Sequence, residues 1–165
     1  MPLPIYFLTK CIQKHNNFYF WSQIIEMTHL KANKEAIDYI VESVSTVYPL
    51  DNQVREALYE HAFSLNMEKG DCLFKQGDIC QYIYFIMKGA LISHTQHNNK
   101  TITTFISIEN NFVSSISGFF GKAPSRESVI AVEPSYLLGI HNDVILQLFE
   151  SSFSLNYIFR LMIEQ

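Results

Sequence analysis

The sequence has 165 residues, of which 48% are hydrophobic and 17% charged, so it can bury one ordinary core and does not require a second large domain. Its formal net charge is −4, and Arg160 is the only Lys or Arg after Arg126, the opposite of what a nucleic-acid-binding surface needs. The three cysteines lack CxxC spacing, which excludes a zinc or iron–sulfur site of four thiolates.

The first part of the chain is rich in aromatic and apolar residues, but it does not have the pattern of a membrane span or a secretory signal. Lys10 and Lys14 interrupt the apolar run before it reaches the ~20 residues that a transmembrane helix needs. The apolar residues also precede the positive charge, whereas a secretory signal has the reverse order. We therefore expect a cytoplasmic protein without a membrane partner, and residues 1–33 form an N-terminal extension of unknown role.

Two amphipathic helices are expected next. Asn33 is placed to cap the first, whose apolar face carries Ile37, Ile40, Val41 and Val44 at helical spacing. After Pro49, Asp51 is placed to cap the second. The apolar side of that second helix carries Val54, Ala57, Leu58 and Ala62.

From about Phe63 to Ile140, short β-branched and aromatic runs are separated by Gly, Asn or Pro, which is typical of an antiparallel roll or sandwich. The expected strands are 64–68, 72–75, 82–88, 90–97, 101–108, 128–132 and 135–140. Gly70, Gly77 and Gly89 are expected at tight turns or bulges, because glycine adopts positive φ without steric cost. We therefore predict a mainly β fold with flanking helices, an antiparallel β-roll or jelly roll.

Helical periodicity returns after Gly139. Asn142 or Asp143 opens one helix, and a last helix is expected to start near Ser152 or Ser154. The last helix carries a continuous apolar stripe of Leu155, Ile158, Phe159, Met162 and Ile163. Part of this stripe would cover the roll. Because it continues beyond what one roll shields, we take these five residues as the candidate interface of a homodimer.

The segment from Lys69 to Leu91, KGDCLFKQGDICQYIYFIMKGAL, resembles the opening of the cyclic-nucleotide-binding fold found in catabolite activator proteins and Fnr-type regulators. The matching positions are Gly70, Phe74, Gly77, the strand core from Tyr84 to Ile86, and Gly89. The resemblance extends over roughly residues 34–165, with the roll and its N-terminal helices in 34–150 and the start of a dimerisation helix in 151–165.

In that family, a phosphate-binding cassette contains a Phe-Gly-Glu before a short helix and a Pro-Arg after it. The resemblance implies that the glycine and helix N-terminus approach the cyclic phosphate, the arginine neutralises it and the glutamate accepts the ribose hydroxyl. Here Phe112 matches the phenylalanine, whereas Val113 and Ser114 replace the glycine and glutamate. We therefore expect weak or no binding of cyclic AMP.

The second half of the cassette also departs from the family. Ser125 follows the proline, and Arg126 comes one position late, which in an extended segment turns the side chain to the opposite face. Arg126 is either an anion clamp or a solvated loop residue beside Glu127. The hydroxyls of Ser114 and Ser115 either contact a ligand or cap the short helix. The candidate ligand-binding residues are Phe112, Val113, Ser114, Ser115, Ser125 and Arg126.

The resemblance implies a non-enzymatic sensor of a Crp/Fnr-type transcription regulator, in which a nucleotide or another small-molecule effector in the roll shifts the C-terminal helix. Contact with DNA would come through a helix-turn-helix domain that is absent from this chain. One alternative is a cupin-like metalloenzyme, but His94 and His97 are three residues apart and would point to opposite faces of a strand, so no metal site is expected. Another is a degenerate roll that serves only as a dimerisation scaffold.

Overall fold

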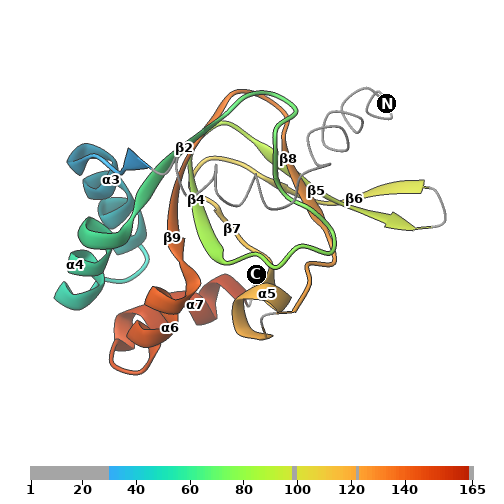
Figure 1. Ribbon diagram of the computed structural model, residues 1–165. Coiled ribbons are helices and arrows are strands. Elements are labelled where there is room, and N and C mark those ends of the chain that lie inside the picture. Colours follow the sequence, from blue (N-terminus) through green and yellow to red (C-terminus); the bar gives the residue numbers. More distant parts are fainter. Residues whose placement is uncertain (1–29, 98–99, 122, 164–165) are drawn as a thin grey trace.

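The computed structural model describes residues 30–97, 100–121 and 123–163, and the side chains of Met162 and Ile163 lie outside this description. Two antiparallel sheets face each other and form the roll (Figure 1). The first has the strand order β1-β2-β9-β4-β7 and the second has the order β3-β8-β5-β6. The predicted fold class is confirmed.

Short strands build the five-stranded sheet around a long central pair, β4 and β9. Its members are β1 (Leu30–Lys31), β2 (Phe63–Met67), β4 (Tyr82–Lys88), β7 (Phe112–Val113) and β9 (Ser135–His141). β1 pairs with β2, so the last residues of the region that we expected to be an extension take part in the sheet. The remaining extension residues, 1–29, lie outside the described residues.

The four-stranded sheet contains β3 (Cys72–Phe74), β5 (Leu91–His97), β6 (Lys100–Ser107) and β8 (Ser128–Ala131). β5 and β6 form a hairpin that projects away from the helices (Figure 1). A register shift between Ser93 and His94 interrupts its ladder. The seven predicted strands are all present, with ends that differ by no more than one residue.

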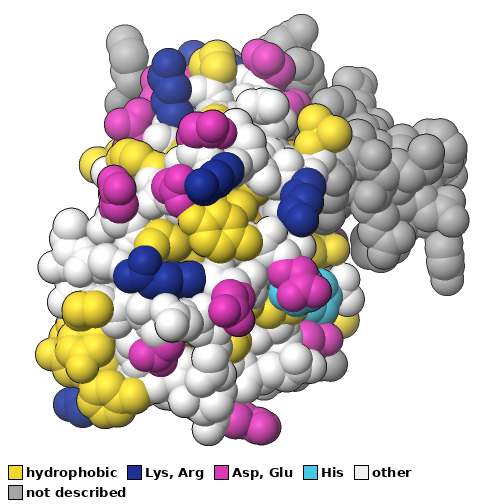
Figure 2. Space-filling view, turned by 90° about the vertical axis from the view of Figure 1, so that its left-hand side faces the viewer, with side chains coloured by type: hydrophobic (Ala, Val, Ile, Leu, Met, Phe, Trp, Pro, Cys, Tyr) yellow, Lys and Arg dark blue, Asp and Glu magenta, His cyan; other side chains and the backbone are white. Residues whose placement is uncertain are grey.

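Helices cover the outer face of the five-stranded sheet. α3 (Lys34–Ser45) and α4 (Asn52–His61) precede the roll, α6 (Asn142–Phe149) and α7 (Phe153–Ile163) follow it, and α5 (Ile116–Gly121) lies between β7 and β8. Asn33 caps α3 as predicted, with its side chain accepting a hydrogen bond from the Ala36 N–H at 2.8 Å. Figure 2 shows the side on which α3 and α4 lie, where acidic and basic side chains surround a few apolar ones.

Strand β4 separates two hydrophobic cores. Ile83 and Phe85 point toward the helices and belong to the cluster that also contains Ile37, Leu58 and Ile158. The alternate residues on β4, Tyr84 and Ile86, point into the roll with Leu91, Val113 and Leu137. Successive side chains of a strand alternate between faces, so a sheet buried on both sides has no polar face along β4.

Three glycines have positive φ values, as predicted: Gly70 at 88°, Gly77 at 95° and Gly89 at 97°. Gly89 is also confined by space, because a Cβ there would overlap Ser135 Oγ. Gly139, on β9, has no such backbone requirement, but a Cβ would overlap the Phe63 ring on the neighbouring strand. Both positions therefore exclude larger residues, Gly139 for packing reasons alone.

Candidate functional site

The cassette segment begins on β7, where two adjacent residues point into different cores. Phe112 packs on the helix side, with its ring centroid 5.0 Å from that of Phe85. Val113 is buried inside the roll, where the side chains of Tyr84 and Ile86 also lie. Val113 thus places a valine side chain in the interior of the roll, at the position where the family's cassette has a glycine.

The two serines that follow use their hydroxyls within the protein. Ser114 Oγ donates to the carbonyl oxygen of Tyr82 at 2.9 Å. Ser115 Oγ accepts from the Gly118 N–H at 3.3 Å, which satisfies one of the free amide groups at the start of α5. Ser115 thus takes the position before α5 and caps its Gly118 N–H, and Ser114 ties the segment to β4. A ligand contact by either hydroxyl stays a prediction.

Ser125 and Arg126 are adjacent in the sequence, but one is buried and the other is exposed. Ser125 is buried, and its Oγ donates to the carbonyl oxygen of Glu127 at 2.8 Å. Its backbone carbonyl accepts from the Gly77 N–H at 2.8 Å, and its N–H donates to the Asp78 carbonyl oxygen at 2.7 Å. Arg126 is exposed, so its guanidinium lies at the surface rather than inside the roll.

The interior of the roll offers neutral polar groups. Ser107 is buried opposite Leu91, and Tyr84 is only 5% exposed. Cys80 is a buried free thiol near Ser114, with the sulfur 4.0 Å from Ser114 Oγ. Burial raises the pKa of the Cys80 thiol and the pKa of the Tyr84 hydroxyl, so both groups are neutral at pH 7. A ligand in the roll would meet hydroxyl, thiol and apolar groups.

An aromatic cluster joins the cassette to the last helices. Phe119, on α5, is buried, and its ring stacks on that of Phe159, on α7, with the centroids 5.2 Å apart. Phe149, at the end of α6, contacts both rings at centroid distances of 6.1 and 5.0 Å. The sequence did not single out Phe119 or Phe149. The adjacent aromatic pair Phe119 and Phe120, in a segment otherwise made of small residues, was the signal available.

Three residues of the apolar stripe on the last helix pack against their own chain. Ile158 is buried, and Leu155 and Phe159 pack against the same helix-side core. These three residues therefore cover the outer face of the five-stranded sheet, and a homodimer interface through the stripe stays a prediction. The side chains of Met162 and Ile163 lie outside the described ones. Among the described side chains of α7, the exposed large ones are Phe153 and Tyr157, whose ring centroids are 6.2 Å apart.

The two histidines considered as metal ligands differ in their exposure to solvent. His94 is 4% exposed and His97 lies at the exposed end of β5. Within the described ranges, no group of three or more His, Cys, Asp or Glu side chains is arranged to hold a metal ion. The same residues contain no helix that is long and apolar enough to cross a membrane.

Comparisons with known proteins agree with this architecture. The family model of the cyclic nucleotide-binding domain matches residues 64–152. No curated protein sequence matches the chain. The chain is similar to a cyclic nucleotide-binding domain from Methylobacillus flagellatus, with 18% identity, a TM-score of 0.68, and coverage of 84% of this chain and 79% of the other.

Two transcription regulators have the same fold over much of the chain. The sensor domain of DNR from Pseudomonas aeruginosa has 18% identity and a TM-score of 0.61, with coverage of 74% of this chain and 89% of that domain. The catabolite activator protein of Thermus thermophilus has 15% identity and a TM-score of 0.57, with coverage of 80% and 54%. The chain thus spans about half the length of that activator.

Proposed function

Because the chain belongs to the family of cyclic nucleotide-binding domains, we propose that it is the ligand-sensing module of a Crp/Fnr-type transcription regulator. In this proposal a small-molecule effector binds in the roll beside the cassette segment, and the last helix carries the response to a partner domain. The module is a sensor and performs no reaction of its own. The likeness to DNR and to the catabolite activator protein supports this choice of regulator class.

The contact between Phe119 and Phe159 carries the proposal. Val113 lies in the roll core, Ser115 caps α5, and Phe119 of α5 stacks on α7. Only a few residues therefore separate the roll interior from the last helix. Packed interiors respond to a displaced group by moving as units, so an effector that displaces Val113 would move α5 and α7 together.

The effector should differ from cyclic AMP. The serines of the cassette already bond within the protein, and Arg126 lies at the surface. Inside a roll whose polar groups are neutral, a cyclic phosphate would have no positively charged side chain to pair with. We therefore propose an effector recognised by hydroxyl, thiol and apolar groups of the roll.

Native mass spectrometry of the purified protein tests the proposal, because a retained small molecule would identify the effector class. Titration with a metabolite library, followed by amide hydrogen exchange, then tests the coupling. Binding in the roll should change exchange in α5 and α7 of the unchanged protein. In Phe159→Leu, which weakens the stacking on Phe119, the change in α7 should shrink. Phe153→Leu, at an exposed position on the same helix, is the matched control.

A second candidate is a roll that binds no effector and acts as a scaffold. It is favoured by the observation that the hydroxyls of Ser114, Ser115 and Ser125 all have partners within the protein. If the library gives no ligand and no retained molecule is found, the scaffold is the better description. Ligand-dependent exchange in α7 would exclude it.

We propose the domain organisation that the sequence indicated: a roll with its helices over 34–150 and a dimerisation helix from 151, with DNA bound through a separate helix-turn-helix domain. The isolated chain, with its net charge of −4, should give no sequence-dependent gel shift at moderate salt. A homodimer through α7 also stays a prediction. Light scattering over a concentration series tests it, and a monomer at high concentration would contradict it.

A further inference from the structure

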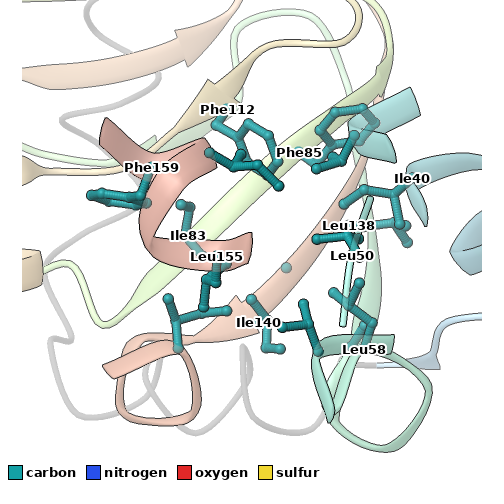
Figure 3. A pocket seen from close by; sticks show the side chains of 16 residues that line it. Ile40, Leu50, Leu58, Ile83, Phe85, Phe112, Leu138, Ile140, Leu155 and Phe159 are labelled. Atoms are coloured by element: carbon teal, nitrogen blue, oxygen red, sulfur yellow. The ribbon is translucent and has the colours of Figure 1, made fainter. Parts of the chain in front are cut away.

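A cavity of about 60 Å³ lies outside the roll, between the helices and the outer face of the five-stranded sheet. Its wall comes from all four covering helices and from the sheet (Figure 3). Ile40 of α3, Leu58 of α4, Ile145 of α6 and Ile158 of α7 face Ile83 and Ile140 of the sheet across it. Every residue in the wall is apolar.

Three residues in the wall of the cavity are only half-buried. Of the residues that line it, all are buried except Phe112, Leu155 and Phe159. These three residues come from β7 and α7, so the cassette strand and the last helix form the least shielded part of the wall. In Figure 3, Phe112 and Phe159 lie in the upper part of the view and Leu155 lies below them.

Size and lining define what can occupy this space. It exceeds the ~10–15 Å³ that one water needs, but water requires two or more polar partners, and an apolar cavity stays dry. It is smaller than the ~150 Å³ cavity that accepts benzene in an engineered protein. An occupant would therefore be uncharged, apolar and only a few heavy atoms in size.

We propose that this cavity is a second ligand site, which takes a small, uncharged apolar molecule such as a short-chain hydrocarbon and lies behind the roll rather than inside it. The half-buried residues of its wall give the site a means of response. Phe112 is the first residue of the cassette segment, and Phe159 stacks on Phe119 of α5. The occupant would thus contact both segments that connect the roll to α7. This site does not depend on an effector in the roll.

The test uses the whole chain with isotope-labelled isoleucine methyl groups, titrated separately with xenon, ethane and benzene. Xenon and ethane should shift the methyl signals of Ile40, Ile83 and Ile140 in a saturable way. Ile130, buried in a separate cluster, should not respond. Ethane should also shift the backbone amide signal of Gly118 in α5. Benzene should bind at least ~10-fold more weakly than ethane, because the cavity is too small for it.

Filling the cavity provides the matched comparison. Val44→Ile and Val54→Ile, made singly and together, each add one methylene to the wall. The double variant should weaken ethane binding at least ~5-fold, since the added groups occupy the space. Val47→Ile, at an exposed position after α3, should leave it unchanged. If one filling variant misfolds, the other retains the test.

The proposal fails if the cavity methyl groups do not respond to ethane, or if filling the cavity leaves ethane binding unchanged. It also fails if xenon alone binds, or if ethane binds without shifting the Gly118 amide. Any of these results would identify the cavity as a packing void. These outcomes are separate from the proposed function, because they do not change whether a metabolite binds in the roll.

Discussion

Ser152 connects the beginnings of two helices that are far apart in the sequence, α4 and α7. Its Oγ donates to the Asp51 carboxylate at 2.6 Å and accepts from the Leu155 N–H at 3.0 Å. Ser154 adds a second link, because its Oγ accepts from the Asp51 N–H at 3.1 Å. Asp51 was expected to cap α4 with its own side chain. It makes no such bond, and its carboxylate instead binds Ser152 at the start of α7.

Replacing Ser152 with alanine should therefore destabilise the fold. The change removes a buried hydroxyl that bonds both the Asp51 carboxylate and the Leu155 N–H. Loss of the hydrogen bond from the Leu155 N–H alone costs about 0.5–1.5 kcal/mol. Urea denaturation measures the loss in the free energy of unfolding. Ser151→Ala is the control: Ser151 is exposed and bonds Gln53 at the surface, so it should change stability by less than about 0.5 kcal/mol. Equal losses for both variants would contradict the prediction.

Acid should destabilise the protein through His94. Burial lowers the pKa of this imidazole, although Glu127 partly opposes the shift, and its Nδ1 has no hydrogen-bond partner among the described residues. The unfolded chain, with a pKa of 6.5, then binds a proton more readily than the folded one. The free energy of unfolding should thus fall as pH drops from 6.5 to the lowered value in the fold.

Urea denaturation at a series of pH values measures this dependence. One histidine accounts for at most about 1.4 kcal/mol per pH unit. His94→Gln should flatten the slope below pH 6.5, whereas His97→Gln, at an exposed position, should leave it as it is. An unchanged slope in His94→Gln would mean that other groups cause the acid sensitivity.

Calorimetry with cyclic AMP should give no dissociation constant in the low-micromolar range or below. One unpaired buried polar group costs about 1–3 kcal/mol, which is one or two decades in affinity, and Val113 also occupies space that a glycine would leave free. Arg126→Ala should not alter the result, because Arg126 is exposed. Tight binding that is lost in Arg126→Ala would show that the arginine does reach the phosphate.

Truncating Phe159 to alanine should cost about 2–4 kcal/mol in the free energy of unfolding, somewhat less than a fully buried phenylalanine. The ring contacts Phe119, Phe120 and Phe149. Phe153→Ala, at a position 69% exposed, should cost less than about 1 kcal/mol. If both changes had the same small effect, and Phe159→Ala reduced self-association instead, the stripe would serve a partner after all.

The sequence predicted elements with strong periodicity and could not predict which surface they bind. The strand expected over 82–88 corresponds to β4. Its aromatic and β-branched residues are typical of a strand, which made the prediction possible. β7 was missed, since two residues show no alternation. The apolar stripe of α7 is visible in the sequence, but a helix with one apolar face can bury that face equally well against its own sheet or against a partner chain. That choice depends on the area left open by the other helices.

The candidate site was predictable to a similar extent. The substitutions at Val113 and Ser114 are visible in the sequence once Phe112 is matched. The sequence left Arg126 open between an anion clamp and a solvated loop residue, and its exposure is visible only in the fold. The contact between α5 and Phe159 could not be foreseen, because it joins segments 40 residues apart through rings that have no motif.

Strand β4 has a core on each face, with Phe85 on the helix side and Ile86 in the roll. Detaching the helices would open one face of this strand while the roll still protects the other, and loosening the roll would do the reverse. Its hydrogen bonds to β9 are therefore broken only when both cores are lost together. The amide hydrogens of β4 should be the last in the protein to exchange with deuterium, and their rate should report global unfolding.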